Sequence, residues 1–214
     1  MAKLLEYYSA LYDRFGLQNW WPADSPFEMM VGAILTQNTS WTGVEKAIAN
    51  LRNNDLLDPH TIVETEQDVL AGIIRPAGYY NQKAKRLKSY SGWFVERFDA
   101  NVDQMKSIPL PQMREELLGQ KGIGPETADS ILLYALDHPS FVIDAYTFRV
   151  LRRHHLIDEE ATYEEMKEFF EENLPPEPAL YNDFHAQIVN VGKHFCRKTP
   201  KCTECPLAPL LPEA

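Results

Sequence analysis

The chain has 214 residues, of which 44% are hydrophobic and 24% charged; this ordinary globular composition excludes long disorder and allows one domain or two small lobes. The formal net charge of -10 is unfavourable for binding nucleic acid, because phosphate contacts need lysine and arginine. However, nine acidic residues lie between Asp158 and Glu177 beside one base, Lys167, whereas ranges 75–88 and 193–201 contain basic residues and no acid. Local basic patches on an acidic body therefore leave DNA binding open.

Apolar residues recur at a spacing of three or four along the chain and predict helices. Residues 1–16 have this spacing but lack the continuous apolar run of a signal peptide or membrane helix, so we expect a cytoplasmic protein without membrane contact. Further stripes predict helices over 27–35, 44–51, 84–98, 128–136, 148–156 and 163–170. Proline and glycine fall mostly between these stretches and no convincing strand is seen, so the predicted fold class is all-α.

A glycine hairpin between two predicted helices is the first candidate site. Within 117–136, Gly122 and Gly124 flank Ile123, and Pro125 stands where the next helix begins. Such glycines let the backbone approach a ligand closely, and free amides at a helix start suit a phosphate. A turn between helices that binds nothing fits the spacing equally well.

Asp144 is the second candidate. It follows an apolar trio and precedes a helical run, which is typical of a helix N-cap. A carboxylate at the floor of a cleft can also stabilise an oxocarbenium ion and orient or deprotonate water. Taken alone, the pattern favours the cap, although one residue can do both.

These two segments together resemble a known signature. The hairpin followed by Thr127 and Ala128, then Asp144 and the run 148–150, is similar to the helix-hairpin-helix and Gly/Pro-Asp motif of HhH-GPD DNA glycosylases, the endonuclease III superfamily. The resemblance extends from Phe27 to Cys205.

The resemblance implies a base-excision-repair enzyme of two helical lobes, with a DNA-binding cleft between them. The expected lobes are a helical barrel at 25–137, with its hairpin at 117–136, and a terminal lobe from 1–24 and 138–214. Its expected partner is double-stranded DNA that contains a damaged base, bound by a monomer in the cytoplasm, at the nucleoid.

The resemblance also implies that Asp144 is the catalytic carboxylate. Bifunctional members carry a catalytic lysine eighteen residues before this aspartate, where the present chain has Glu126. Without an amine there is no Schiff base. We therefore expect a monofunctional glycosylase that hydrolyses the N-glycosidic bond, without lyase activity and without a cofactor for catalysis.

Two loops resemble the DNA-contacting loops of the family. Gln37 matches the glutamine that fills the gap left by the extruded nucleotide, since an amide both donates and accepts. Tyr79 matches the wedge that enters the base stack, with Lys83 and Lys85 near phosphates. Alternatively, these segments are only an N-cap region and a solvated basic helix start. The expected hairpin contacts to DNA are Gly122, Ile123, Gly124 and Thr127.

The expected base pocket rests on a likeness to the endonuclease III-like 3-methyladenine DNA glycosylases. The likeness is carried by 19–22, which reads Asn-Trp-Trp-Pro, by 35–39 with Trp41, and by 75–87. It implies that the flipped base stacks between Trp20 or Trp21 and Trp41. An alkylated purine is cationic, and a cation-π contact with an indole face contributes about 0.5 to 2 kcal/mol to its binding. The alternative is that Trp20 and Trp21 are core residues.

Other substrates and another class of protein stay open at this point. Adenine glycosylases carry an additional acid in the helix before the glutamine, where 31–35 here is entirely apolar or glycine, so that substrate is disfavoured. Mismatched thymine or uracil, or an oxidised pyrimidine, fits the hairpin and aspartate equally well. If Asp144 is only a cap, the chain is a non-catalytic DNA-binding module.

The three cysteines, Cys196, Cys202 and Cys205, lie near the carboxyl end, so a disulfide framework is not expected and a metal site is considered. Family members with a 4Fe-4S cluster space four cysteines with six, two and five residues between them. Here the first gap is five residues and Leu211 stands in the fourth place. Three thiolates are unusual for a stable cluster, so the pattern favours its loss over a site with one other ligand.

Overall fold

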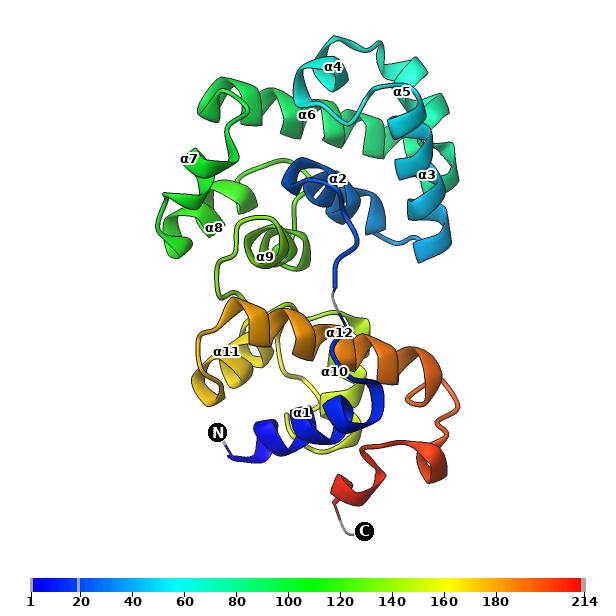
Figure 1. Cartoon of the computed structure of the whole chain (residues 1–214), viewed down its shortest axis with the longest axis vertical. Helices are drawn as coiled ribbons and strands as arrows, with labels where there is room; N and C mark the ends of the chain where they lie inside the picture. The colour runs from blue at the N-terminus through cyan, green and yellow to red at the C-terminus, as the bar shows by residue number, and fades with distance from the viewer. Residues whose placement is uncertain (1, 19, 213–214) are drawn as a thin grey trace. The chain divides into compact units, whose positions relative to one another are not determined.

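The computed structural model describes residues 2–18 and 20–212, and this part of the chain is helical with no strand (Figure 1). The predicted all-α class is therefore confirmed. The chain divides into two compact units: unit 1 comprises 1–20 and 139–214, and unit 2 comprises 21–138. None of the helices described is at once long and apolar enough to cross a bilayer. Asn19, part of the tryptophan motif, lies outside the described residues.

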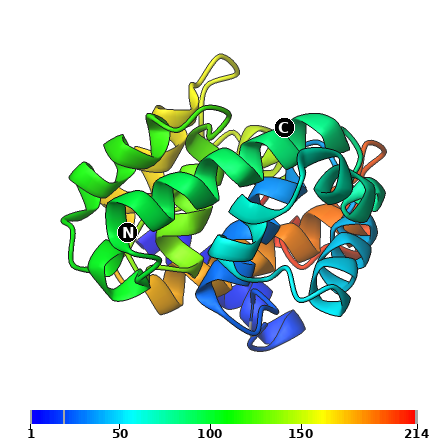
Figure 2. The same ribbon diagram turned by 90° about the horizontal axis from the view of Figure 1, so that it is seen from above.

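Unit 2 is built around a helix that is buried on all sides. Its elements are α2 (Pro26–Thr36), α3 (Trp41–Asn53), α4 (Pro59–Glu64), α5 (Gln67–Ile73), the 3-10 turn η1 (Arg75–Ala77), α6 (Tyr80–Phe98), α7 (Val102–Lys106), α8 (Leu110–Leu118) and α9 (Pro125–Tyr134). Every residue from 27 to 35 is buried, as expected for a predominantly apolar helix, and its one charged residue, Glu28, accepts from Arg52. Helices α3, α6 and α9 pack against α2, and α6 is the long blue-green helix that crosses the unit in Figure 2.

Unit 1 joins the two ends of the chain. Its elements are α1 (Ala2–Phe15), α10 (Ala145–Arg153), α11 (Tyr163–Asn173), α12 (Pro178–His194) and the 3-10 turns η2 (Cys202–Glu204) and η3 (Ala208–Leu210). Phe141 stacks on Phe170 with ring centroids 3.8 Å apart, and Phe184 on α12 meets both rings edge-on. Helix α12 also packs against α1 and α10, so it is the central helix of this unit.

Candidate functional site

The hairpin joins α8 to α9 in a conformation that requires glycine at one position. Gly122 has φ +89°, and a Cβ there would lie 2.5 Å from Nε of Arg86, so a side chain at this position would strain the backbone and push the Arg86 side chain aside. Ile123 is 6% exposed and belongs to the core of unit 2. Its side chain therefore anchors the hairpin and only its backbone is left for a ligand. Gly124 is the N-cap residue of α9, with Pro125 as the first helical residue.

A buried ion pair fixes the two helices of the hairpin. Arg114 on α8 donates from Nε and Nη2 to the two carboxylate oxygens of Asp129 on α9, at 2.8 and 3.0 Å. The Asp129 side chain is 0% exposed. Such a bidentate pair has one geometry, so it sets the angle at which α8 and α9 present the hairpin.

Gln37 lies directly against this hairpin. Its Nε2 donates to the carbonyl oxygen of Gly122 and to Oγ1 of Thr127, both at 2.9 Å. Its Oε1 accepts from Nη1 of Arg86 at 2.5 Å. The structure thus brings together Gln37, Gly122 and Thr127, which were predicted as DNA contacts from separate segments. It adds Arg86, which sequence reasoning had counted only as one charge of a basic stretch.

Tyr79 stands out from the surface of unit 2. It is 66% exposed and, as the N-cap residue of α6, has a left-handed backbone with φ 45°, directly after Gly78 with φ 64°. A large aromatic residue held in this strained conformation points to a constraint other than packing. Arg75 and Lys85, on either side along the chain, are also exposed.

The structure corrects the expected role of Lys83. This lysine is 1% exposed, and its Nζ donates to the carbonyl oxygens of Leu35 and Ala77 and to Oγ1 of Thr39, at 2.8, 2.7 and 2.6 Å. Burial lowers the pKa of Lys83 to about 8. Its ammonium is enclosed, so it ties the Gln37 loop to the Tyr79 loop and does not face a phosphate. The sequence predicted a solvent-exposed lysine at this position, because lysine is rarely fully buried.

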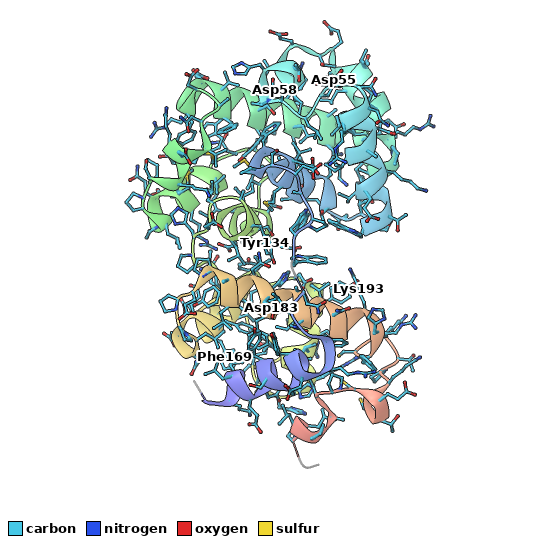
Figure 3. The ribbon with its side chains drawn as sticks, in the orientation of Figure 1. Asp55, Asp58, Tyr134, Phe169, Asp183 and Lys193 are labelled. Carbon is cyan, nitrogen blue, oxygen red and sulfur yellow. The ribbon has the colours of Figure 1, made fainter. Side chains whose placement is uncertain are left out.

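Three aromatic side chains form a half-buried cluster in unit 2. The ring of Trp21 meets Trp41 edge-on at 5.0 Å and lies 5.6 Å from Tyr134 on α9, which is labelled in Figure 3. Gly32 on α2 leaves room for this indole, because a Cβ would lie 3.3 Å from its ring. Sequence reasoning found both tryptophans of this cluster and missed Tyr134, which lies within the helix predicted over 128–136.

In the division of the chain into units, Trp20 belongs to unit 1, whereas Trp21 belongs to unit 2. Lys193 on α12, labelled in Figure 3, places Nζ 5.3 Å from the centre of the Trp20 ring. This is a cation-π contact within unit 1. Of the two alternatives, Trp21 is therefore the residue that accompanies Trp41.

Asp144 is the N-cap residue of α10. Its Oδ1 accepts from the backbone nitrogen of Thr147 at 2.7 Å and from Thr147 Oγ1 at 2.9 Å. Its Oδ2 lies 3.8 Å from Nε2 of the buried His185 on α12. The cap thus uses one oxygen, and 14% of the Asp144 side chain is exposed, so the carboxylate is fixed but still accessible.

Glu126, at the position of the family's lysine, lies in the first turn of α9 and is exposed. A negative charge near the start of a helix is stabilised by the helix dipole. The residue has no amine and cannot form a Schiff base.

The cysteine segment does not fit a four-thiolate cluster. Cys196 is buried, Cys205 partly buried and Cys202 exposed, and the cavity that they line with Leu211 has about 30 Å³, room for a water or two. Among the residues described, no three His, Cys, Asp or Glu side chains are grouped to hold a metal ion. Arg153 donates instead to Cys196 Sγ and to the carbonyl oxygen of Arg197, at 3.3 and 2.6 Å.

Comparisons with known proteins agree on one family. The model of HhH-GPD superfamily base excision DNA repair proteins matches residues 31–176. A protein of Methanocaldococcus jannaschii named as a DNA repair glycosylase is 51% identical over 202 residues, which cover 94% of this chain and 91% of that protein.

Solved structures give the same fold. H. pylori 3-methyladenine DNA glycosylase (MagIII), bound to 1,N6-ethenoadenine, matches with a TM-score of 0.74 and 35% identity, over 89% of this chain and 94% of that one. Endonuclease III in a non-covalent DNA complex matches with a TM-score of 0.82 and 20% identity, over 99% and 95%. The second likeness is one of fold alone.

Proposed function

The chain belongs to the HhH-GPD superfamily of base excision DNA repair proteins, and we propose that it is a monofunctional DNA glycosylase that removes an alkylated purine such as 3-methyladenine from double-stranded DNA, as a monomer. The observation that carries the proposal is the carboxylate of Asp144, one oxygen of which is held by Thr147 while 14% of the side chain remains exposed. Asp144 also lies within the region that the family model matches.

Asp144 supplies the chemistry in this proposal. As the bond between the base and the sugar breaks, positive charge develops on the sugar, and a fixed carboxylate stabilises it without reorganising. The same carboxylate orients and deprotonates the water that adds to the sugar. An alkylated purine carries a positive charge and leaves as a neutral base, so no strong general acid is needed.

The aromatic cluster of Trp21, Trp41 and Tyr134 supplies base recognition. A cationic purine stacks more strongly on an indole face than a neutral base does, by about 0.5 to 2 kcal/mol. The 35% identity to a structure named as a 3-methyladenine glycosylase with a bound purine supports the same substrate class. Trp20 takes no part in this stacking in our proposal, because its ring already makes a cation-π contact with Lys193.

Gln37, Tyr79 and the hairpin hold the opened duplex. Gln37 leaves its bonds to Gly122 and Thr127 and fills the gap in the stack, while Tyr79 stacks on the neighbouring bases. The backbone of 122–124 and the start of α9 bind phosphate oxygens, and Lys85 and Arg75 supply charge. The free-state bonds of Gln37 hold its side chain in one conformation until DNA replaces them.

Two readouts test this function. The protein is incubated with duplexes that carry 3-methyladenine, 7-methylguanine, uracil or a thymine mismatch, and the product is analysed with and without hot alkali. We expect free methylated purine and strand breaks only after alkali, both lost in Asp144→Asn. Breaks without alkali would contradict the monofunctional assignment, and release of uracil or thymine alone would replace the alkylated purine as substrate.

We propose that the cysteine segment, residues 196–205, folds without an iron-sulfur cluster. Besides the bonds of Arg153, Arg149 donates to the carbonyl oxygens of Cys196 and Gly192 at 2.5 and 3.1 Å, so two arginines of α10 hold the segment. Freshly purified protein should then contain no iron and show no absorbance near 400 nm. Stoichiometric iron with that absorbance would reject this part of the proposal.

A further inference from the structure

A buried histidine accompanies the carboxylate to which we assign the chemistry. His185 on α12 is 5% exposed, and its Nε2 lies 3.8 Å from Oδ2 of Asp144. This oxygen is not the one that Thr147 holds, because Thr147 donates to Oδ1. The two sides of the carboxylate therefore have different neighbours, a fixed cap on one side and an imidazole on the other.

The surroundings of His185 hold its ring in place. The ring of Phe141 meets it edge-on, at a centroid distance of 6.5 Å and an interplanar angle of 87°. Helix α12 is itself held by Asp183, labelled in Figure 3, which accepts from Tyr8 Oη at 2.9 Å and from the backbone nitrogen of Gln18 at 2.8 Å. An imidazole held in this way beside Oδ2 can set the orientation of the Asp144 carboxylate.

We propose that His185 is a positioning residue for Asp144: its neutral imidazole donates from Nε2 to Oδ2 and fixes the carboxylate plane when substrate is bound. The present 3.8 Å is too long for a hydrogen bond, but catalytic hydrogen bonds are often long in a free enzyme and shorten in the complex. This inference rests on the proposed function of Asp144.

The neutral state of His185 is part of the inference. Burial lowers the pKa of this histidine below its usual 6.5, while the nearby Asp144 charge opposes the shift. The charge that acts on this imidazole is that of Asp144, which faces Nε2, whereas Asp183 on the same helix is turned toward Tyr8 and Gln18. A proton on His185 would cancel the charge of Asp144 just where a developing cation needs it, so activity should fall as the pH drops through the lowered pKa of His185.

The test compares two substitutions of His185 with one of another buried histidine. His185→Phe keeps the bulk and removes the donor, whereas His185→Gln keeps an amide donor at a similar reach. His154, 6% exposed and bonded through Nδ1 to Tyr7, supplies the matched control His154→Phe. The measurements are the single-turnover rate of methylated purine release from pH 5 to 9, and Kd for a duplex with an abasic-site analogue.

We expect His185→Phe to slow base release about tenfold or more, the size of one hydrogen bond to a charged group, with Kd unchanged. His185→Gln should recover most of the rate and lose the fall at acid pH, and His154→Phe should release base at the wild-type rate. A wild-type rate in His185→Phe, or an acid fall that persists unchanged in His185→Gln, would overturn the inference. The pH profile of His185→Gln tests the inference even if His185→Phe does not fold.

Failure here is distinguishable from failure of the proposed function. If Asp144→Asn is inactive and His185→Phe is as fast as the wild type, the proposed function stands and the positioning role is wrong. If Asp144→Asn releases base at the wild-type rate, the proposed function itself is wrong.

Discussion

Replacing Asp129 by asparagine is expected to lower the free energy of unfolding by about 3 to 5 kcal/mol, the usual cost of breaking a buried ion pair by removing one partner. The fully buried carboxylate accepts two charged hydrogen bonds from Arg114, whose own side chain is 18% exposed. An asparagine retains one acceptor oxygen and turns its amide donors toward the guanidinium. Arg114 then keeps a charge that is neither fully solvated nor fully paired.

The measurement is urea unfolding of both proteins, with stability taken from the midpoint and slope. Glu116→Gln is the control, because its pair with Arg97 is 3.3 Å long and the two side chains are 23% and 48% exposed; we expect less than about 1 kcal/mol there. A loss below about 1 kcal/mol for Asp129→Asn as well would refute the reasoning that this pair fixes the hairpin.

Three further predictions follow from single contacts. Gly122→Ala should weaken DNA binding about tenfold or more, because its Cβ would displace Arg86 at a left-handed position that costs about 1 to 2 kcal/mol; an unchanged Kd would contradict this. Thr147→Val removes one of two bonds to Asp144 and should lower kcat several-fold with KM unchanged, whereas a change in KM alone would point to another role. Since the pKa of Lys83 is lowered from 10.5 to about 8, the folded protein releases this proton at lower pH than the unfolded chain does. The free energy of unfolding of the wild type, relative to Lys83→Met, should therefore rise between about pH 8 and 10.5; a constant difference across that window would show that Lys83 titrates normally.

The features predicted best from the sequence are those set by local chemistry. The expected cap at Asp144 is present, since an aspartate before a helical run binds the free amide of Thr147. Pro125 similarly begins α9, and the stripe at 27–35 lies within α2. These interactions involve residues a few positions apart, so a single segment contains the information.

The features that were missed depend on packing between distant segments. Helix α12 escaped detection because it is buried on several sides and so has no single apolar stripe, and His185 was missed with it. Lys83 was placed at the surface because nothing in its own segment reveals the carbonyl oxygen of Leu35, which is 48 positions away. Tyr134 and Arg86 likewise acquire their places only through Trp21 and Gln37.

The central claim is that the Asp144 carboxylate cleaves the bond between an alkylated purine and its sugar. Its most direct test is the single-turnover rate of 3-methyladenine release from methylated duplex DNA, measured for the wild type and for Asp144→Asn at equal occupancy of the DNA. We predict that the variant folds and binds the duplex normally but releases the base at least about 100-fold more slowly, as expected when charge stabilisation at the reacting centre is removed. Release of 3-methyladenine by Asp144→Asn at the wild-type rate would contradict the account.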